Sequence, residues 1–460
     1  MRATLIGHAC WVIETTAGCF VTDPVFFDPF EEGTVTSCPR REVRVDQLPA
    51  LRGIFVSHRH LDHFDFPSLA ALDRRLPVFC PHEPLLVYGL RRLGFTDLRF
   101  LEPFVPQQID NLRLLPTPSL NQQVREYGLV FQDTSGTLFN QVDTFLAPDA
   151  IRRLQYEVGH IDVHLAMYAS QHFGFFESQR AKTAAIYALN LNTALMLNAG
   201  CVVPASAGFR FVDALMWLNR HVFPISRATF LTDLQRLNPA LQTLTIDPGD
   251  VLCLEHSTIT RQHQAAAYVT MCGDDTYLLA HDASAPVPPL VDANPAGYGQ
   301  QGLQEFACGL LERSLWPYLV RGIASGDPVV QQYVQHSVTY QVEVVLPDTA
   351  HCWTYCFDCQ RHEVQLISGP GKTVPHIRRR IAASALVDFC LGRRSYFAIR
   401  TQSRQSSQVF ELIATPRGIE AHEIHLPDLL THYIVHAMPG ADRRGAQWVD
   451  FATRTLIEGR

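Results

Sequence analysis

The stretch that most constrains the fold of this chain is a turn rich in potential metal ligands that follows an apolar segment. Residues 51–56 (Leu-Arg-Gly-Ile-Phe-Val) have the composition of a short buried strand. Residues 57–63 (Ser-His-Arg-His-Leu-Asp-His) follow directly, at the carboxyl end of that strand. Because alternate residues of an extended segment point the same way, the first two histidines can hold one ion, and the aspartate and third histidine a second. The four candidate ligands are His58, His60, Asp62 and His63.

The composition indicates a folded chain with more than one core. Of the 460 residues, 47% are hydrophobic and 18% are charged, which favours two domains and argues against disorder. The formal net charge is −7 and the basic runs 378–380 and 393–394 are short, so we expect no nucleic-acid partner. With no apolar run long enough to span a membrane and no signal-peptide pattern, we expect no membrane association, a cytoplasmic location and twelve reduced, mostly buried cysteines.

The order of expected elements predicts an α/β domain followed by a smaller α+β domain. Up to about residue 255, strands alternate with helices and several strand pairs are hairpin-like, which fits two sheets flanked by helices. Residues 283–302 are rich in proline and glycine and are expected to link domain 1–282 to domain 303–460. In the second domain we expect strands over 339–346 and 364–367, and helices over 376–391 and 428–436.

Two further expectations concern the surroundings of the ligand turn. Ser68 can cap a helix that begins near Leu69. Asp23 ends the strand before an Asp-Pro turn and can either orient a ligand histidine or simply form that turn. Other expected helices cover 69–76, 84–93 and 180–197, and other expected strands cover 78–80, 112–115, 128–131, 138–143, 160–168 and 201–204.

The order of these motifs along the chain resembles the metallo-β-lactamase superfamily. The matching features are Gly7-His8-Ala9, the strand ending at Asp23, the turn 57–63 and the strand ending at Asp143. The resemblance covers roughly residues 1–255 and implies an αββα sandwich with a metal site at the sheet edges. It also implies that Asp143 bridges two metals, and that His8 and Asp23 support the ligands from behind.

Within this superfamily the chain is most similar to the non-Rieske part of CMP-N-acetylneuraminate hydroxylases and their bacterial relatives. The matching stretches are 57–69, 138–143 and 203–209, with a weaker match over 376–410. Those hydroxylases carry a Rieske cluster held by Cys-x-His and Cys-x-x-His. Here Cys80-Pro81-His82 fits the first half, but the second half occurs only far downstream, as 359–362. We therefore expect no Rieske cluster.

Two histidines of the superfamily pattern are missing. The third motif falls on residues 117–123, and the last motif on 204–206 (Pro-Ala-Ser), and neither contains a histidine. Some di-iron hydroxylases of this fold have a glutamate in the third motif, and by that resemblance Glu126 is the preferred substitute. Other candidates are His160, His164 and His172, although each is typical of a surface or core residue.

Three functions remain open from these residues. A site of two histidines and one carboxylate with open positions is typical of non-haem iron, which favours a di-iron oxygenase that hydroxylates a small organic substrate with electrons from a separate reductase. The second hypothesis is a dinuclear hydrolase of an ester, lactone or phosphoester, with zinc as the alternative metal. The third is a non-catalytic binding module. We assign catalytic roles to Asp62 and Asp143.

Other stretches suggest a substrate pocket but no further cofactor. The aromatic clusters 172–176 and 208–211 can wall an apolar pocket in which His172 and Arg210 contact the substrate, or can simply pack in the core. Residues 351–362 hold three cysteines and two histidines, for which buried thiols in a strand are favoured over a zinc site. No glycine-rich phosphate loop is present, so we expect no nucleotide.

Overall fold

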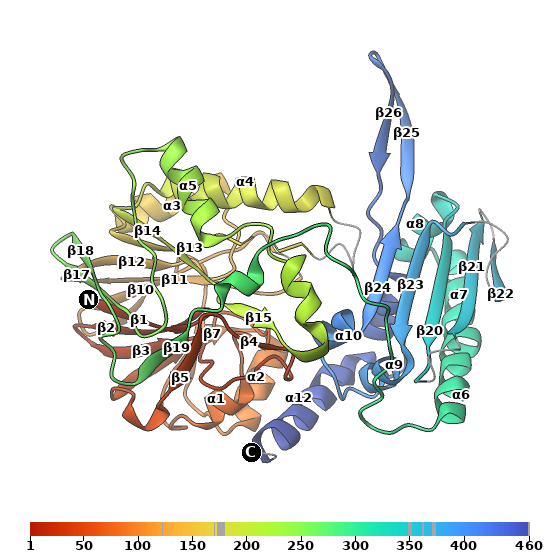
Figure 1. Ribbon diagram of the computed structural model, residues 1–460, viewed down its shortest axis with the longest axis horizontal. Helices are drawn as coiled ribbons and strands as arrows, with labels where there is room; N and C mark the ends of the chain where they lie inside the picture. The colour runs from red at the N-terminus through yellow and green to blue at the C-terminus, as the bar shows by residue number, and fades with distance from the viewer. Residues whose placement is uncertain are drawn as a thin grey trace. The chain divides into compact units, whose positions relative to one another are not determined.

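The computed structural model describes residues 1–121, 123–169, 171–172, 180–347, 352–360, 363–369 and 374–458. It divides into two compact units (Figure 1). Unit 1 holds Met1–His172 and Ala181–Pro286 together with the end of the chain from Ala452, and unit 2 is built on Val287–Phe451. Among the described residues, no helix has both the length and the apolar character needed to cross a bilayer.

The first sheet of unit 1 is half antiparallel and half parallel. From β18 to β3 each strand runs antiparallel to its neighbour, and from β3 to β8 the strands are parallel. The carboxyl ends of β3 and β6 therefore meet at one edge of the sheet. The spatial order is β18 (Thr258–Gln262), β17 (Val251–Glu255), β1 (Arg2–Gly7), β2 (Cys10–Thr15), β3 (Gly18–Thr22), β6 (Leu51–Phe55), β7 (Val78–Pro81) and β8 (Leu98–Leu101).

The second sheet of unit 1 has seven strands and packs face to face with the first. Trp11, Phe20 and Phe55 from the first sheet share one buried core with Phe131 and Leu138 from the second. Strands β12, β13, β14 and β16 are parallel, so their carboxyl ends also meet at one edge. The order is β16 (Gln242–Thr243), β14 (Cys201–Ala205), β13 (Val163–Met167), β12 (Gly136–Asn140), β11 (Gly128–Asp133), β10 (Leu112–Thr117) and β9 (Gln107–Ile109).

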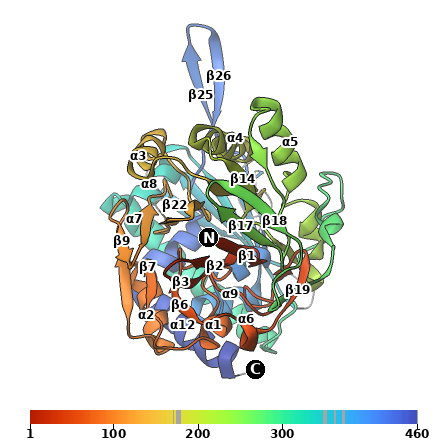
Figure 2. The same ribbon diagram turned by 90° about the vertical axis from the view of Figure 1, so that its left-hand side faces the viewer.

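Helices cover both outer faces of this pair of sheets, as Figure 2 shows. Ile151 and Leu154 of α3 pack on Val130 and Phe139 of the second sheet, because the apolar side of this amphipathic helix faces the strands. The predicted αββα sandwich is thus confirmed. The helices are α1 (Phe66–Ala70) and α2 (Pro84–Arg92) on the first sheet, and α3 (Pro148–Val158), α4 (Arg180–Leu197) and α5 (Arg227–Leu237) on the second.

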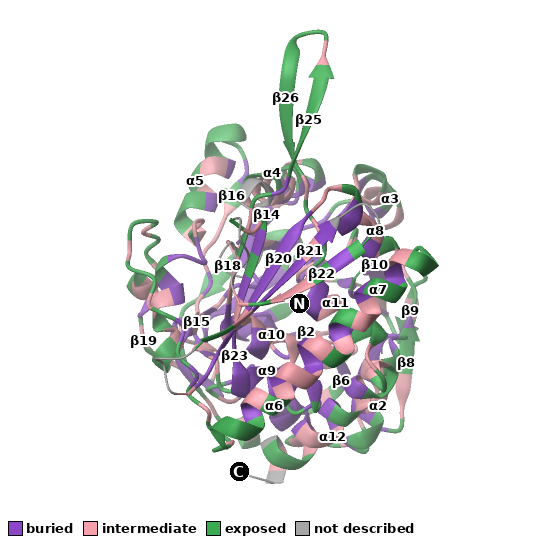
Figure 3. Cartoon of the chain, turned by 90° about the vertical axis from the view of Figure 1, so that its right-hand side faces the viewer, coloured by how far each residue is buried: buried purple, intermediate pink, exposed green. Residues whose placement is uncertain are grey.

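Unit 2 is a smaller mixed domain, as expected. A sheet in the order β22 (Glu363–Ser368), β21 (Cys352–Gln360), β20 (Thr339–Val345), β23 (Ile377–Ala382) and β24 (Ser403–Ser407) forms its core with surrounding helices. Its central strands are largely buried, whereas the hairpin of β25 (Phe410–Thr415) and β26 (Gly418–Glu423) is exposed along its length (Figure 3). The helices include α6 (Gln300–Leu310), α7 (Trp316–Ser325), α8 (Pro328–Gln335), α9 (Ala383–Cys390), α10 (Tyr396–Thr401), α11 (Leu429–His432) and α12 (Ala441–Glu458).

Two sequence-based predictions of helices were wrong. Residues 376–391 are not one helix, because β23 precedes α9. The strand pattern was hidden by Arg379, which lies inside between Ile377 and Ile381 and donates a hydrogen bond to Gln405 Oε1.

The helix expected over 69–76 also differs. Helix α1 begins at Phe66 and ends at Ala70, because Asp65 rather than Ser68 is its N-terminal cap and accepts the backbone N–H of Ser68 at 2.9 Å. The Ser68 hydroxyl instead accepts the backbone N–H of Phe26. This contact ties the loop after β3 to the helix that follows the ligand turn.

Candidate metal centre

The ligand turn starts where β6 stops, and its backbone closes on itself. The carbonyl of His60 accepts the N–H groups of His63 at 3.0 Å and Phe64 at 2.7 Å. This tight turn brings His63 back beneath the strand end, so that His58 and His63 are fully buried while His60 reaches the surface. The ring centroids of His58 and His63 lie 4.2 Å apart.

Asp23 anchors this turn from the end of the neighbouring parallel strand β3. Its carboxylate accepts the Ser57 backbone N–H at 2.7 Å, the Ser57 hydroxyl at 2.7 Å and His63 Nδ1 at 2.9 Å. Because the Ser57 hydroxyl donates to Asp23, its oxygen accepts from His58 Nδ1 at 2.9 Å. Asp23 thus holds Nδ1 of His63 directly and Nδ1 of His58 through Ser57. The Nε2 atom of each histidine remains available to bind a metal.

The structure brings potential ligands together in two groups that share one histidine. Within each group, one ligand atom from each residue lies within 4.8 Å of the others. His63 Nε2 lies 3.3 Å from Asp143 Oδ2 and 3.6 Å from Asp62 Oδ2, and His8 Nε2 lies 3.2 Å from Asp62 Oδ2. One group is His58, His63 and Asp143, and the other is His8, Asp62 and His63.

His60 falls in neither group, although it was predicted to hold an ion with His58. Its Nδ1 lies 2.9 Å from His58 Nε2, so the two rings contact each other directly. His8 was predicted only to support the ligands, yet it reaches Asp62 directly.

Several buried polar atoms in this cluster have no hydrogen-bond partner among the residues that the structure describes. They are His63 Nε2, Asp143 Oδ1 and both ring nitrogens of His8. Buried polar atoms in proteins are nearly always paired, so unpaired nitrogen and carboxylate atoms that converge on one place fit a bound cation. The donor set of imidazoles and carboxylates suits a divalent metal.

The charges in the cluster also favour a cation. Burial opposes a positive charge on His63, but the carboxylates of Asp62 and Asp143 outweigh it and raise the pKa of His63 well above its ordinary value. Burial and the neighbouring His63 and His60 hold the pKa of His58 well below its usual range. His58 is therefore neutral, as a metal-binding imidazole must be.

Glu126 lies next to this cluster, in the loop before β11. It is 3% exposed, and its carboxyl oxygens accept Ser119 Oγ at 2.6 Å and Asn121 Nδ2 at 3.1 Å. Burial, reinforced by the charge of Asp143, raises the pKa of Glu126 to about 7. Glu126 thus provides a buried carboxyl close to Asp143, just after the third-motif residues 117–123, which contain no histidine.

The three alternative histidines fall outside both groups. His164 is a core residue: its Nε2 pairs with Gln141 Oε1 at 2.8 Å, its ring stacks on Phe139, and burial lowers its pKa to about 3. His160 is exposed, 3.9 Å from Asp162. The backbone N–H of His172 binds Val222, and its ring Nδ1 lies 3.4 Å from Thr183 Oγ1.

The residues predicted to line a substrate pocket differ in their surroundings. Arg210 Nε in β15 (Phe209–Phe211) donates to Asp275 Oδ2 at 2.6 Å, so this guanidinium is engaged in an ion pair. Phe209 meets the His8 ring edge-on at 5.3 Å, which places the aromatic cluster 208–211 beside the metal centre. Residues 173–176 of the other predicted cluster lie outside the described residues.

One acidic residue of the site was missed by sequence reasoning. Glu31 is 5% exposed, and its Oε2 is buried without a hydrogen-bond partner. Burial and the nearby Asp62 carboxylate raise the pKa of Glu31 well above its ordinary value. Its neighbour Phe30 stacks against the His8 ring, which places this loop beside the cluster. The sequence around Glu31 reads as an ordinary turn, and we find no signal in it that predicts a site.

The cysteine-rich stretch does not form a zinc site with its described residues. Cys352 and Cys356 are four positions apart along β21 and share one face of the sheet, whereas Cys359 lies on the other face. None of the three forms a disulfide among the described residues. His351 and His362 lie outside the described residues, so the second half of the Rieske pattern, 359–362, is described only at Cys359 and Gln360. Its first half is the buried Cys80 in β7 followed by an exposed His82.

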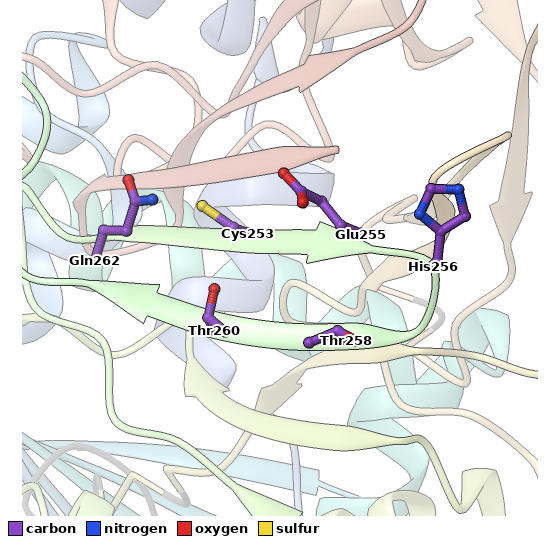
Figure 4. A pocket seen from close by; sticks show the side chains of 6 residues that line it. All are labelled: Cys253, Glu255, His256, Thr258, Thr260 and Gln262. Atoms are coloured by element: carbon purple, nitrogen blue, oxygen red, sulfur yellow. The ribbon is translucent and has the colours of Figure 1, made fainter.

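A surface hollow of about 390 Å³ lies away from these ligands, on the hairpin of β17 and β18 (Figure 4). Its lining holds no group of residues that could bind a metal, among the part of the chain that the structure describes. The lining residues are Cys253, Glu255, His256, Thr258, Thr260 and Gln262.

Comparison with known proteins agrees with this fold. Residues 20–178 match the family model of the β-lactamase superfamily domain. A curated protein of Mycolicibacterium smegmatis, provisionally named a Rieske 2Fe-2S iron-sulfur protein, is 27% identical over 179 residues, 37% of this chain and 34% of that protein. The match therefore spans about a third of the length of that relative.

Two solved structures are similar to part of the chain. An isothiocyanate hydrolase from Delia radicum gut bacteria is 17% identical, with a TM-score of 0.42 over 55% of this chain and 100% of its own. CmlA, a diiron β-hydroxylase from Streptomyces venezuelae, is 18% identical, with a TM-score of 0.35 over 45% of each chain.

The αββα fold, the superfamily model matched over residues 20–178 and the cluster of histidines and carboxylates together define a β-lactamase superfamily domain with a candidate metal centre. Unit 1 has the metallo-β-lactamase fold and residues 20–178 of the chain match the superfamily domain, which confirms the resemblance drawn from the sequence motifs. The relative named for a Rieske cluster agrees with the narrower resemblance to the hydroxylases.

Proposed function

We propose that this chain is a non-haem di-iron oxygenase that hydroxylates a small organic substrate. The observation that carries the proposal is the buried Glu126 carboxyl beside Asp143, held by Ser119 and Asn121 where the third motif lacks a histidine. Exchanging an imidazole for a carboxylate makes the donor set richer in oxygen, which suits iron better than zinc.

The clustered side chains divide between two metals in this proposal. His58 and Asp143, with the nearby Glu126, would hold one metal, while Asp62 and His63 would hold the other. When bound, the two irons supply the activation of O2 that amino-acid side chains cannot perform.

The protein itself fixes the ligands and excludes water. The pair of Asp23 and Ser57 sets the orientation and the protonated nitrogen of two histidines before a metal arrives. Phe30 and Phe209 flank the His8 ring and shield that side of the site from water. We propose that electrons come from a separate reductase and that no Rieske cluster is held by this chain.

The test is metal analysis followed by O2 uptake. Protein from iron-supplemented cells is expected to hold about two irons per chain and to consume O2 under reducing conditions. Glu126→His, which restores the superfamily pattern, is expected to shift the preference toward zinc and to abolish O2 uptake. Arg125→His, which adds an imidazole at the neighbouring exposed position, is the matched control and should behave like the wild type.

A dinuclear hydrolase is the second candidate. It is favoured by Asp62: burial would raise its pKa, but His63 and His8 hold it well below the usual range, so Asp62 is an anion available as a general base. Zinc as the only bound metal, turnover of an ester, lactone or phosphoester and no O2 uptake would overturn the oxygenase in favour of this reaction. Failure of the purified chain to retain any metal would instead favour a binding module.

A further inference from the structure

We infer that His8 is a metal ligand, and that it supplies the nitrogen of the second metal position together with Asp62 and His63. This inference rests on the metal centre of the proposed function, but not on the reaction that the centre performs. Sequence reasoning gave His8 only a supporting role. The histidines it offered as replacements for the missing ones, His160, His164 and His172, fall outside both ligand groups.

The geometry places His8 among the ligands rather than behind them. Its Nε2 lies 3.2 Å from Asp62 Oδ2, and its ring centroid lies 5.1 Å from that of His63. Nε2 of His63 is in turn 3.6 Å from the same Asp62 oxygen. Three atoms from three residues thus surround one small space, and each belongs to a side chain that binds divalent metals.

Asp62 is the polar group that the His8 ring faces in the described part of the chain. His8 is 4% exposed, its Nε2 lies 3.2 Å from Asp62 Oδ2, and its Nδ1 has no hydrogen-bond partner among the described residues. The core histidine His164 also leaves its Nδ1 unpaired, but its Nε2 pairs with Gln141 and its ring stacks on Phe139, whereas the His8 Nε2 faces a carboxylate. A cation between His8, Asp62 and His63 would give the unpaired His8 and His63 nitrogens a partner.

The backbone holds His8 in an unusual conformation that directs it to the site. His8 lies in the turn between β1 and β2, with φ at +51°, next to a register shift between Leu5 and Gly7. Outside glycine, such a left-handed conformation is uncommon, and it persists where the surroundings impose it. The surroundings that impose it come from the segment after β14.

That segment supports His8 at close range. A Cβ atom on Gly208 would lie 2.8 Å from the backbone nitrogen of His8, so only glycine allows the approach. The carbonyl of Gly208 accepts the N–H of Cys38, and Phe209 meets the His8 ring edge-on. The strand end that carries no histidine of its own thus packs against a histidine from β1–β2 and keeps it facing Asp62.

The test uses cobalt as the probe metal and counts the bound histidines. In the Co2+-loaded full chain, each bound histidine gives a paramagnetically shifted, solvent-exchangeable ring N–H signal in the proton NMR spectrum. One of these signals should come from His8. His8→Gln should lose one signal and bind the second Co2+ at least tenfold more weakly. His221→Gln, at another buried histidine, is the control and should change neither quantity.

Two outcomes would overturn the inference: a His8→Gln spectrum that keeps every shifted signal of the wild type, or a folded His8→Gln protein that keeps both ions with wild-type affinity. If His8→Gln does not fold, His8→Cys provides a gain of signal, because a coordinated thiolate adds a charge-transfer absorption band to the cobalt spectrum. If a folded, cobalt-loaded His8→Cys protein lacks this absorption band, the inference is contradicted. If the iron-loaded enzyme consumes no O2 while the His8 signal is present, the oxygenase fails and the ligand assignment stands.

Discussion

Asp23 and His63 form a fully buried pair in which Asp23 Oδ2 accepts a hydrogen bond from His63 Nδ1 at 2.9 Å. The two residues lie 40 positions apart in sequence. They meet because β3 and β6 are parallel neighbours whose carboxyl ends share one edge. The metal centre therefore depends on the pairing of two strands as much as on the ligand turn itself.

Asp23→Asn is expected to weaken metal binding while the fold is retained. An amide at this position can still accept the Ser57 backbone N–H, but it no longer favours a proton on His63 Nδ1, so Nε2 is less available to the metal. Loss of such a supporting carboxylate typically weakens metal affinity about 10- to 100-fold.

Competition with a chelator measures this affinity. Asp133→Asn is the matched control, because Asp133 also ends a strand and accepts the Thr16 backbone N–H at 2.9 Å, and it is not among the candidate ligands. Equal affinities for the two variants would contradict the role of Asp23.

Metal removal should lower the thermal stability of unit 1. A ligand that binds only the folded state stabilises it, by about 2.7 kcal/mol when present at a hundredfold excess over its dissociation constant. Calorimetry of the metal-loaded and chelator-treated protein should show a higher unfolding temperature for the loaded form.

In His58→Ala, the difference in unfolding temperature between the metal-loaded and the chelator-treated protein should shrink, because a ligand of one metal is lost. In His256→Ala, at an exposed turn outside both ligand groups, it should persist. An unfolding temperature that does not respond to metal in the wild type would argue against a bound cation in the folded state.

Much of unit 1 could be predicted from the sequence because its signals are local. An apolar strand followed by closely spaced ligands predicts the site, and strand–helix alternation predicts the layers. In unit 2, by contrast, the charged residue Arg379 occupies an interior position of β23. It breaks the alternation of apolar and polar residues that would have revealed that strand.

The rest of the site depends on contacts between distant segments. His8 joins a ligand group, and Glu31 and Glu126 lie near the cluster, from three different loops, and no spacing in the sequence relates these loops to the turn 57–63. Likewise, His60 was grouped with the ligands by its spacing, and the structure shows that the turn directs it to the surface. Patterns along the chain predict ligand types better than they predict which ligands meet.

Gly208→Ala is expected to destabilise the protein and to disturb the His8 side of the site. The added methyl group would lie 2.8 Å from the His8 nitrogen and 3.0 Å from its Cα, and overpacking of this kind typically costs about 1–3 kcal/mol. Chemical denaturation and metal titration measure the two effects.

Gly302→Ala provides the comparison. Gly302 lies in α6 with nothing within 4 Å of an added Cβ, so the alanine should be neutral or stabilise the helix by about 0.5–1 kcal/mol. A Gly208→Ala protein as stable as the wild type, with unchanged metal affinity, would show that the close approach to His8 is not required.

The stability of the metal-free protein should fall between pH 7 and pH 5 because of His164. Burial lowers the pKa of His164 to about 3 in the folded chain, whereas in the unfolded chain a histidine titrates near about 6.5. Between these values the unfolded state binds a proton that the folded state cannot bind, so stability present above pH 6.5 is lost as the pH falls. From pH 7 to pH 5 this single group contributes a loss of about 2 kcal/mol.

Urea unfolding of the chelator-treated protein at both pH values isolates this contribution. His164→Gln should show a smaller loss than the wild type, because a glutamine has no proton to bind, whereas His256→Gln at an exposed turn should reproduce the wild-type loss. Titration of other groups, including His63, is common to all three proteins and cancels in the comparison. The prediction fails if the free energy of unfolding falls equally in the wild type and in His164→Gln between the two pH values. That result would show that His164 takes up its proton in the folded protein.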